Sequence, residues 1–291
     1  MFKSVSLLVL TNLAVMAVLG LIVAGLQAAG VLPMWGSGQM IPLFIIAGLF
    51  GFGGAAVSLF LSKSLAKRRL RMITQPSNPT EAWLMETVAR QARAAGIDMP
   101  EVGIEDAPYM NAFATGPSKN SSLVAVTTGL LRGMSQDEVE AVLAHEISHA
   151  ANGDMVSMTL IQGVVNTFVI VFAQILGTLI DNALSRGRSR SRGIGFYAGY
   201  YLTQMVLGVL ATIIVRWFSR RREFRADAGA AKLTSAQKMV AALHRLKTQT
   251  PPEVPAREAT LGIDGSRLKS LFATHPPLED RIEALGGMRF N

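Results

Sequence analysis

The first fifth of the chain is hydrophobic and carries no charge. From residue 4 to residue 62 there is no Asp, Glu, Lys or Arg, and only the turn "VLPMWGSGQ" (31–39) interrupts the apolar run. Each side offers about 25 residues, enough for a helix to cross a hydrocarbon core of about 30 Å. The run is too long for the apolar part of a cleaved signal peptide, and it leads into a second span. The pattern therefore predicts a retained hairpin of two membrane helices over 1–62.

Two further long stretches without charge lie in the second half of the chain, at 155–180 and 194–215. A buried helix of a soluble protein seldom runs so far without a charged residue. We therefore expect a second membrane hairpin within 155–218. Its connecting loop, "SRGRSRSRG" (185–193), holds four arginines.

The remaining segments, 63–154 and 219–291, are polar enough to lie outside a membrane. In the first, "NPTEAW" opens a predicted helix that runs to about Ala95. Short apolar runs separated by turns follow, and they predict a small β-sheet. These runs are "EVGIE" (101–105), "YMNAFATG" (109–116) and "SLVAVTTG" (122–129). The second segment is predicted to be mainly helical, interrupted by the loop "TPPEVP" (250–255).

Composition supports membrane insertion and restricts the possible metal ligands. Half of the 291 residues are hydrophobic and only 16% are charged, which is typical of a membrane protein. The net charge of +8 does not indicate nucleic-acid binding, because the basic residues gather at the ends of apolar runs, where they contact anionic headgroups. There is no cysteine, so any bound metal must be held by histidine and carboxylate side chains.

A predicted helix near the middle of the chain carries a candidate metal site. In "MSQDEVEAVLAHEISHAANGD" (134–154), Ser135 and Glu138 form a capping box ahead of apolar residues at helical spacing. His145 and His149 lie at i and i+4, so both imidazoles project from one face and can share one metal ion. Glu146 follows the first histidine and is placed to act as a general base rather than as a ligand.

A zinc site of this kind needs a third protein ligand and leaves one position for water. His244 is one candidate, but a single histidine on an amphipathic helix is usually a surface or packing residue. The segment "REFRADAGAAKL" (222–233) is the stronger candidate. Glu223 and Asp227 share one helix face there, so Glu223 can bind the metal while Asp227 accepts a hydrogen bond from a ligand histidine. Taken alone, the segment would be interpreted as an exposed, charged start of a helix.

Three motifs together resemble one protein family. "AHEISHAANGD", "RRREFRADAGAA" and "THPPLEDRI" occur in this order around two apolar spans. This arrangement is similar to the HtpX family of bacterial integral-membrane zinc metallopeptidases, which are related to the CAAX prenyl endopeptidases. The resemblance covers nearly the whole chain, including "NAFATG" (111–116). It implies His145, His149 and Glu223 as zinc ligands, Glu146 as the general base, and a role in quality control of membrane proteins under stress.

The last motif, "THPPLEDRI" (274–282), has two interpretations. Its prolines suit the first turn of a helix, and the apolar residues that follow would give a C-terminal packing helix. A peptidase also needs donors for the oxyanion of its tetrahedral intermediate, and His275 and Arg281 are suitable in kind. The family resemblance favours this catalytic role.

The segment 109–116 also has two interpretations. As an edge strand ahead of the metal-site helix, it would pair with the backbone of an extended substrate, with contacts from Asn111, Ala112, Phe113 and Ala114. It can equally be an ordinary strand of the sheet.

The spacing of the motifs constrains the topology. His149 and Glu223 must reach one metal ion, so the segment 155–215 must leave and return on the same side of the membrane. Basic clusters follow the second and fourth apolar runs and place that side in the cytoplasm. The four-arginine loop then lies on the far side, against the same rule. The alternative is that 155–215 enters the membrane without crossing it.

We therefore predict a mainly α-helical integral membrane protein with four transmembrane helices and a zincin-like α+β catalytic domain, whose small sheet lies on the cytoplasmic side. The predicted boundaries are 1–62, 63–154, 155–218 and 219–291. The expected activity is hydrolysis of misfolded or damaged membrane proteins and unfolded polypeptides at the bacterial inner membrane, with one zinc ion per chain and no nucleic-acid partner. The alternatives are a CAAX-type processing peptidase, or an inactive membrane scaffold with a structural zinc.

Overall fold

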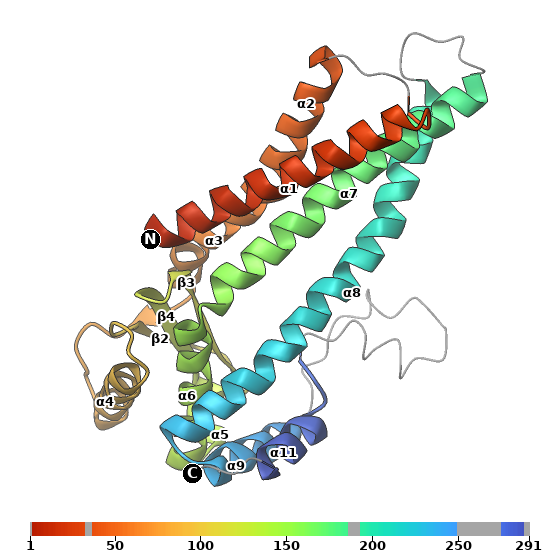
Figure 1. Ribbon diagram of the computed structural model, residues 1–291. Helices are drawn as coiled ribbons and strands as arrows, with labels where there is room; N and C mark the ends of the chain where they lie inside the picture. Colours follow the sequence, from red (N-terminus) through yellow and green to blue (C-terminus); the bar gives the residue numbers. More distant parts are fainter. Residues whose placement is uncertain (1, 33–36, 186–192, 249–274, 288–291) are drawn as a thin grey trace. The chain divides into compact units, whose positions relative to one another are not determined.

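The computed structural model describes residues 2–32, 37–185, 193–248 and 275–287 (Figure 1). Its internal contacts divide the chain into two compact units, each built from two separate segments. The first, which we call the polar unit, comprises 59–156 and 216–291. The second, the apolar unit, comprises 2–58 and 157–215. Two predicted features, the four-arginine loop and the "TPPEVP" loop, lie outside the described residues.

Long helices make up the apolar unit. In chain order they are α1 (Phe2–Ala28), α2 (Ser37–Gly48), the π-helical segment η1 (Leu49–Gly53), α3 (Gly54–Lys67), α7 (Asp154–Ser185) and α8 (Ile194–Leu233). Three of them, α3, α7 and α8, include residues of the polar unit as well. Among the described residues, four stretches are long and apolar enough to cross a membrane: Val9–Ala28, Ile41–Lys67, Asp154–Leu184 and Ile194–Leu233. The prediction of four candidate membrane helices is therefore confirmed.

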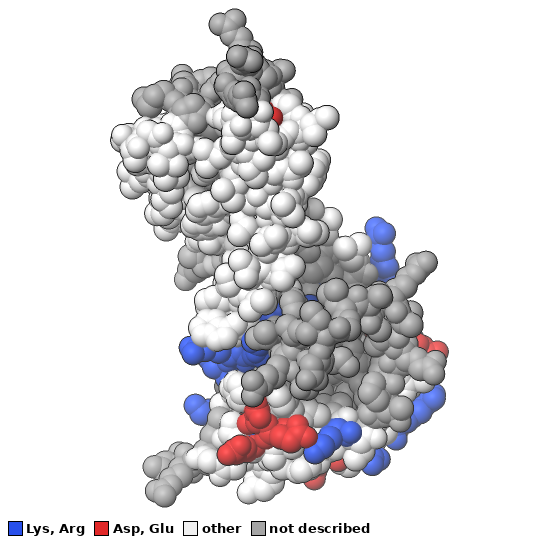
Figure 2. All heavy atoms as spheres, turned by 90° about the vertical axis from the view of Figure 1, so that its right-hand side faces the viewer, with Lys and Arg blue, Asp and Glu red and all other residues white. Residues whose placement is uncertain are grey.

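The apolar unit packs through small residues, and its described residues 4–32, 37–58, 157–185 and 193–215 carry a single charged side chain. Gly51, in the π-helical segment, lies so close to Thr167 of α7 that a side chain would collide with its backbone. Apolar residues of α1, α2 and α7 surround Leu19 and Val171, which are fully buried. In the face drawn in Figure 2, charged side chains are gathered on the polar unit, and the apolar unit is white apart from one acidic side chain. Asp181 is the only acidic residue in its sequence.

Asp181 has a structural role at the end of the second hairpin. Its two carboxylate oxygens accept hydrogen bonds from the backbone N–H groups of Gly193 (3.0 Å) and Phe196 (3.1 Å). Gly193 directly precedes α8 and Phe196 lies in its first turn, where backbone N–H groups have no partner within the helix. The last turns of α7 thus cap the start of α8.

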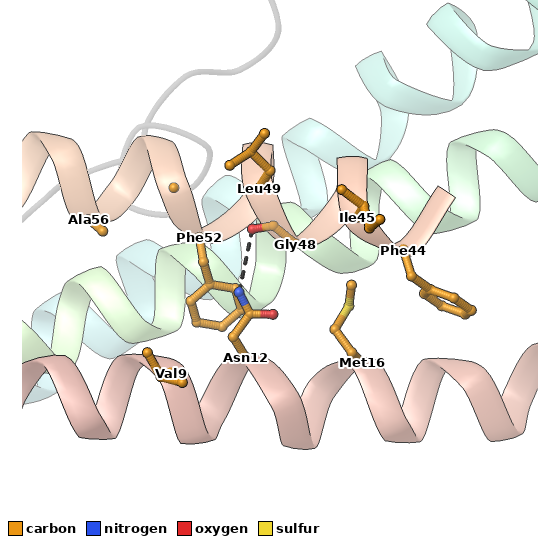
Figure 3. A pocket seen from close by; sticks show the side chains of 10 residues that line it. Val9, Asn12, Met16, Phe44, Ile45, Gly48, Leu49, Phe52 and Ala56 are labelled. Atoms are coloured by element: carbon orange, nitrogen blue, oxygen red, sulfur yellow. Dashed lines mark hydrogen bonds between the residues drawn. The ribbon is translucent and has the colours of Figure 1, made fainter. Parts of the chain in front are cut away.

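A cavity of about 590 Å³ lies between α1 and the helices α2 and η1 (Figure 3). Its walls are apolar except for Asn12, whose side-chain nitrogen lies 3.5 Å from the carbonyl oxygen of Gly48. Gly48 immediately precedes the π-helical segment, where the hydrogen-bond ladder of the helix changes register. The amide of Asn12 therefore faces a backbone carbonyl at the point where regular helical pairing is interrupted.

A four-stranded sheet organises the polar unit. The strands are β1 (Arg71–Met72), β2 (Glu101–Glu105), β3 (Ala112–Ser118) and β4 (Ser121–Thr127), in the order β1-β2-β4-β3. Strands β2 and β4 run parallel, and the other two pairs are antiparallel. The three predicted strands are confirmed and β3 lies at the edge of the sheet, whereas the two-residue β1 was not predicted.

Helices cover the sheet and complete the core of this unit. They are α4 (Pro79–Ala94), α5 (Thr128–Gly133), α6 (Gln136–Asn152), α9 (Ala236–Lys247) and α11 (Leu278–Gly286). On one face of the sheet, Val124 and Val126 pack with Leu143 and Ile147 of α6. On the other face, Leu123 packs with residues from the end of α3. Alternation along β4 thus places α6 directly against the sheet, beside the edge strand.

One helix joins the fourth candidate span to the polar unit. Helix α8 continues without a break from Ile194 to Leu233, through the arginine-rich segment that follows the uncharged run 194–215. Because the helix is continuous, Glu223 and Asp227 lie on an extension of the fourth candidate span.

Candidate metal centre

The local sequence of α6 fixes the positions of its histidines. Ser135 and Glu138 form the predicted capping box, with Glu138 accepting a hydrogen bond from Ser135 N (2.7 Å). The helix ends at Gly153, which adopts a left-handed conformation (φ 69°) that favours glycine. His149, one turn before this end, is largely buried, and His145, a further turn back, is buried on the same side of the helix. Their Nε2 atoms are 3.1 Å apart.

Glu223 of α8 completes a cluster of three donors. Its Oε2 lies 3.5 Å from Nε2 of His145, and its Oε1 lies 3.4 Å from Nε2 of His149. A tetrahedral zinc ion with bonds of 2.0–2.1 Å requires donors about 3.3 Å apart. The three separations, 3.1–3.5 Å, match that requirement. These three side chains were predicted as ligands, and the structure brings them together in a suitable metal-binding geometry.

The outer nitrogen of His145 faces Asp227, as the spacing on α8 had suggested. Nδ1 of His145 lies 2.9 Å from Oδ1 of Asp227. Asp227 is itself held by Arg281 of α11, which donates from Nε (2.8 Å) and Nη2 (2.6 Å) to its two oxygens. All three side chains are buried. Arg281 therefore contacts the centre through Asp227 and also directly, since its Nη1 lies 3.6 Å from Oε2 of Glu223.

The outer nitrogen of His149 has its own carboxylate, which the sequence analysis did not identify. Nδ1 of His149 lies 2.6 Å from Oδ2 of Asp154. Asp154 is the last residue of the quoted motif "AHEISHAANGD" and the first residue of α7. The signal available in the sequence was an aspartate directly after a glycine that could end the helix.

The carboxylates around the two histidines favour a bound cation. Burial by itself would lower the pKa of both imidazoles. Hydrogen bonds to Asp227 and Glu223 outweigh that effect and raise the pKa of His145. Those to Asp154 and Glu223 raise the pKa of His149 to about 9. Negative charge that stabilises a protonated imidazole also stabilises a divalent ion beside a neutral one, so this donor set fits a metal such as zinc.

His275 lies beside the third ligand. Its Nδ1 is 2.6 Å from Oε2 of Glu223, and its side chain is 60% exposed. His275, Arg281, His145 and Glu146 all line one cavity of about 330 Å³. His244, the other histidine of the sequence, is exposed on α9 and does not belong to the three-donor cluster.

The residues predicted to bind substrate divide between two cavities along the edge strand. Asn111 and Ala112 line the cavity that contains Glu146. Phe113 and Ala114 line a second cavity of about 480 Å³, whose other wall is the end of α3. The two cavities therefore follow one another along β3.

His145 and His149 of α6 and Glu223 of α8 have the arrangement of a metallopeptidase centre, with Glu146 lining the adjoining cavity. Of these two helices, α8 is also a candidate membrane span. Residues 78–289 match the sequence profile described as Peptidase family M48. The chain belongs to this family, which confirms the resemblance seen in its motifs.

Relatives with known names agree with that assignment. Protease HtpX of Xanthomonas oryzae pv. oryzae (strain MAFF 311018) is 52% identical over 292 residues, covering 98% of this chain and 97% of that protein. Protease HtpX of Stenotrophomonas maltophilia (strain R551-3) is 52% identical over 289 residues, with 98% of each chain covered. The crystal structure of S. mikatae Ste24p matches with a TM-score of 0.61 at 20% identity, covering 84% of this chain and 58% of that one. The last similarity concerns the fold alone.

Proposed function

We propose that this protein is a zinc-dependent endopeptidase that hydrolyses misfolded or damaged membrane proteins. The observation that carries the proposal is the cluster of His145, His149 and Glu223, whose donor atoms have the separations of a tetrahedral site. Glu146 lies on the same helix and lines the adjoining cavity without belonging to the cluster. A purely structural zinc is usually enclosed by four protein ligands, whereas only three come together among the described residues.

Zinc held by these three residues would polarise the carbonyl of the peptide bond and make a water molecule more acidic. Glu146 is the base that takes the proton from that water, and it then passes the proton to the leaving amine. His275 is the exposed donor at the rim of the cavity and stabilises the oxyanion of the substrate. Arg281 lines the same cavity and is the second proposed donor to the oxyanion, while its Nε and Nη2 hold the aspartate that faces His145.

The substrate segment is proposed to bind in an extended conformation along β3. This strand is at the edge of the sheet and is only partly buried from Ala112 to Thr115. An extended peptide adding to such an edge makes backbone hydrogen bonds that do not depend on its sequence. Asn111 to Ala114 would contact it between the two cavities. Folded proteins offer no free strand of this kind, so unfolded polypeptides and flexible loops are the proposed substrates.

The proposed location is the bacterial inner membrane, with the metal centre on the cytoplasmic side. Two basic clusters at the ends of apolar runs support this orientation, because cytoplasmic segments next to membrane helices are enriched in Lys and Arg. They are Lys63, Lys67, Arg68, Arg69 and Arg71 after the second run, and Arg216, Arg220, Arg221, Arg222 and Arg225 after the fourth. The partners are the lipid bilayer and membrane-protein substrates.

The decisive experiment replaces Glu146 with glutamine in the full-length protein. Glu146→Gln should bind zinc as well as the wild type, because Glu146 is not a ligand, and should lose peptide hydrolysis by a factor of at least about 10²–10⁴. The substrate is a membrane protein with a flexible cytoplasmic loop, and Glu138→Gln, a capping residue at the far end of the same helix, serves as control. Cleavage by Glu146→Gln at the wild-type rate would exclude this mechanism, and absence of chelator-sensitive cleavage in the wild type would favour the inactive scaffold.

A further inference from the structure

In each histidine of the cluster, Nδ1 lies against a carboxylate that also contacts an arginine. His145 faces Asp227, which is bound by Arg281. His149 faces Asp154, whose Oδ1 lies 3.2 Å from Nη2 of Arg225. Asp154 and Arg225 lie within the quoted motifs, but the sequence analysis gave neither of them a role at the metal site.

Asp154 is held in place from three directions. Its side chain is 1% exposed, so its charge must be compensated by contacts within the protein. One oxygen faces His149 and the other faces Arg225. Arg222 donates to the backbone carbonyl of the same residue (3.1 Å). A buried carboxylate with this number of defined contacts has one preferred orientation.

The turn between α6 and α7 explains how Asp154 reaches a histidine five residues earlier. Gly153 ends α6 in the left-handed conformation, and α7 begins at the next residue. The chain therefore changes direction between His149 and Asp154, instead of carrying the aspartate on to another face of one continuous helix. A residue other than glycine would be strained at φ 69°.

We propose that Asp154 is a positioning residue of the metal centre, which fixes the imidazole of His149 so that Nε2 points to the metal. With its Nδ1–H donated to the carboxylate, His149 must present the unprotonated Nε2 toward His145 and Glu223, which lie 3.1 and 3.4 Å away. The negative charge of Asp154 also makes that nitrogen a stronger ligand. Arg225 and Arg222 of α8 hold the aspartate for this task.

This inference rests on the proposed metal site and ties it to the membrane helices. Asp154 is the first residue of α7, and Glu223, Arg222 and Arg225 belong to α8. Both helices continue into candidate membrane spans. The orientation of His149 is therefore determined by α7 and α8 as well as by α6.

The test measures zinc affinity in the full-length, detergent-solubilised protein by competition with a chelating dye. We expect Asp154→Ala to bind zinc about 10–100-fold more weakly than the wild type. Asp154→Asn should lose less, because its amide oxygen still accepts the hydrogen bond from Nδ1–H. Asp137→Ala, which removes an exposed carboxylate at the start of α6, should bind like the wild type.

A second readout separates positioning from general destabilisation. Cobalt substituted for zinc should give a visible absorption spectrum that is shifted in Asp154→Ala and closer to the wild type in Asp154→Asn, since this spectrum reports ligand geometry. The inference would be overturned if folded Asp154→Ala kept both the zinc affinity and the cobalt spectrum of the wild type. If the alanine variant does not fold, the same result in Asp154→Asn would overturn it. A wild-type protein that binds no zinc would instead contradict the proposed function on which the inference rests.

Discussion

Glu223 determines whether the two histidines of α6 form a metal site of useful affinity. Two imidazoles alone make a weak site, and Glu223 is the third donor. Glu223→Ala should therefore abolish most of the zinc content of the purified protein. Asp227→Ala, which removes the carboxylate between His145 and Arg281 but no metal ligand, should weaken binding less, by about 10–100-fold. Elemental analysis of the purified variants measures both effects.

The matched control is Glu279→Ala, which removes an exposed carboxylate of α11 paired with Lys247. It should keep the zinc content of the wild type. A Glu223→Ala variant with full zinc content would show that another residue is the third ligand. His275 would then be the first to test, because it already lies 2.6 Å from Glu223.

At the scale of single residues, local relations could be predicted from the sequence and distant ones could not. His145, Glu146 and His149 share one helix, so their relative positions follow from its periodicity. Glu223 and Asp227 were found in the same way on α8. The ion pair between Arg281 and Asp227 joins residues 54 positions apart, and no local pattern specifies it. Asp154 was missed because its contact depends on a turn, which the helical spacing of the motif does not describe.

At the scale of elements, close packing around Gly51 gives a sharp test of the apolar unit. A Cβ at this position would lie 2.9 Å from the backbone of Thr167 in α7. Gly51→Ala should therefore force the helices apart and reduce stability by about 1–3 kcal/mol. Thermal unfolding in detergent, followed by circular dichroism, measures the effect.

Gly54→Ala is the matched control, three residues along the chain. A Cβ at Gly54 has no neighbouring atom within 4 Å, and alanine in a helix is more favourable than glycine by about 0.5–1 kcal/mol. This variant should be as stable as the wild type or slightly more so. Equal unfolding temperatures for both variants would mean that η1 and α7 do not pack as described.

The elements themselves were predictable to different degrees. Uncharged runs long enough to span a membrane identified the membrane helices, and turns between short apolar runs identified β2, β3 and β4. The strand order β1-β2-β4-β3 depends on pairing between distant segments and could not be read from the sequence. The sequence did not specify that α8 is one continuous helix, because the arginines after residue 215 follow the end of an apolar run without interrupting the helix.

At the scale of the whole molecule, chain length limits how far the metal centre can lie from the membrane. Glu223 follows the apolar stretch of α8, which ends at Val215, by eight residues, or about 12 Å of helix. His149 precedes α7 by five residues, which span at most about 17 Å even when extended. These limits hold for any arrangement of the two units. The metal centre, the start of the third candidate span and the end of the apolar stretch of the fourth must therefore lie on one side of the bilayer.

The same connectivity predicts which segments face opposite sides. If 155–215 crosses the membrane twice, the loop at 185–193 lies opposite the metal centre. A cysteine replacing Ser189 should then react with a membrane-impermeant maleimide from the periplasmic side of intact cells. A cysteine replacing the exposed Gln75 of the polar unit should react only after the inner membrane is permeabilised. Both single-cysteine variants are interpretable because the natural sequence contains no cysteine.

The four arginines of that loop make the experiment informative, because the positive-inside rule alone would place the loop in the cytoplasm. Connectivity opposes this placement. The loop lies between the third and fourth candidate spans, and the metal centre joins residues before the third span to residues after the fourth apolar run. Labelling of Ser189→Cys from the periplasm would show that connectivity outweighs the local charge. Labelling of both cysteines only after permeabilisation would mean that 155–215 enters the membrane and returns without crossing it. The metal centre would be unaffected in that case, since all of its contacts lie within the polar unit.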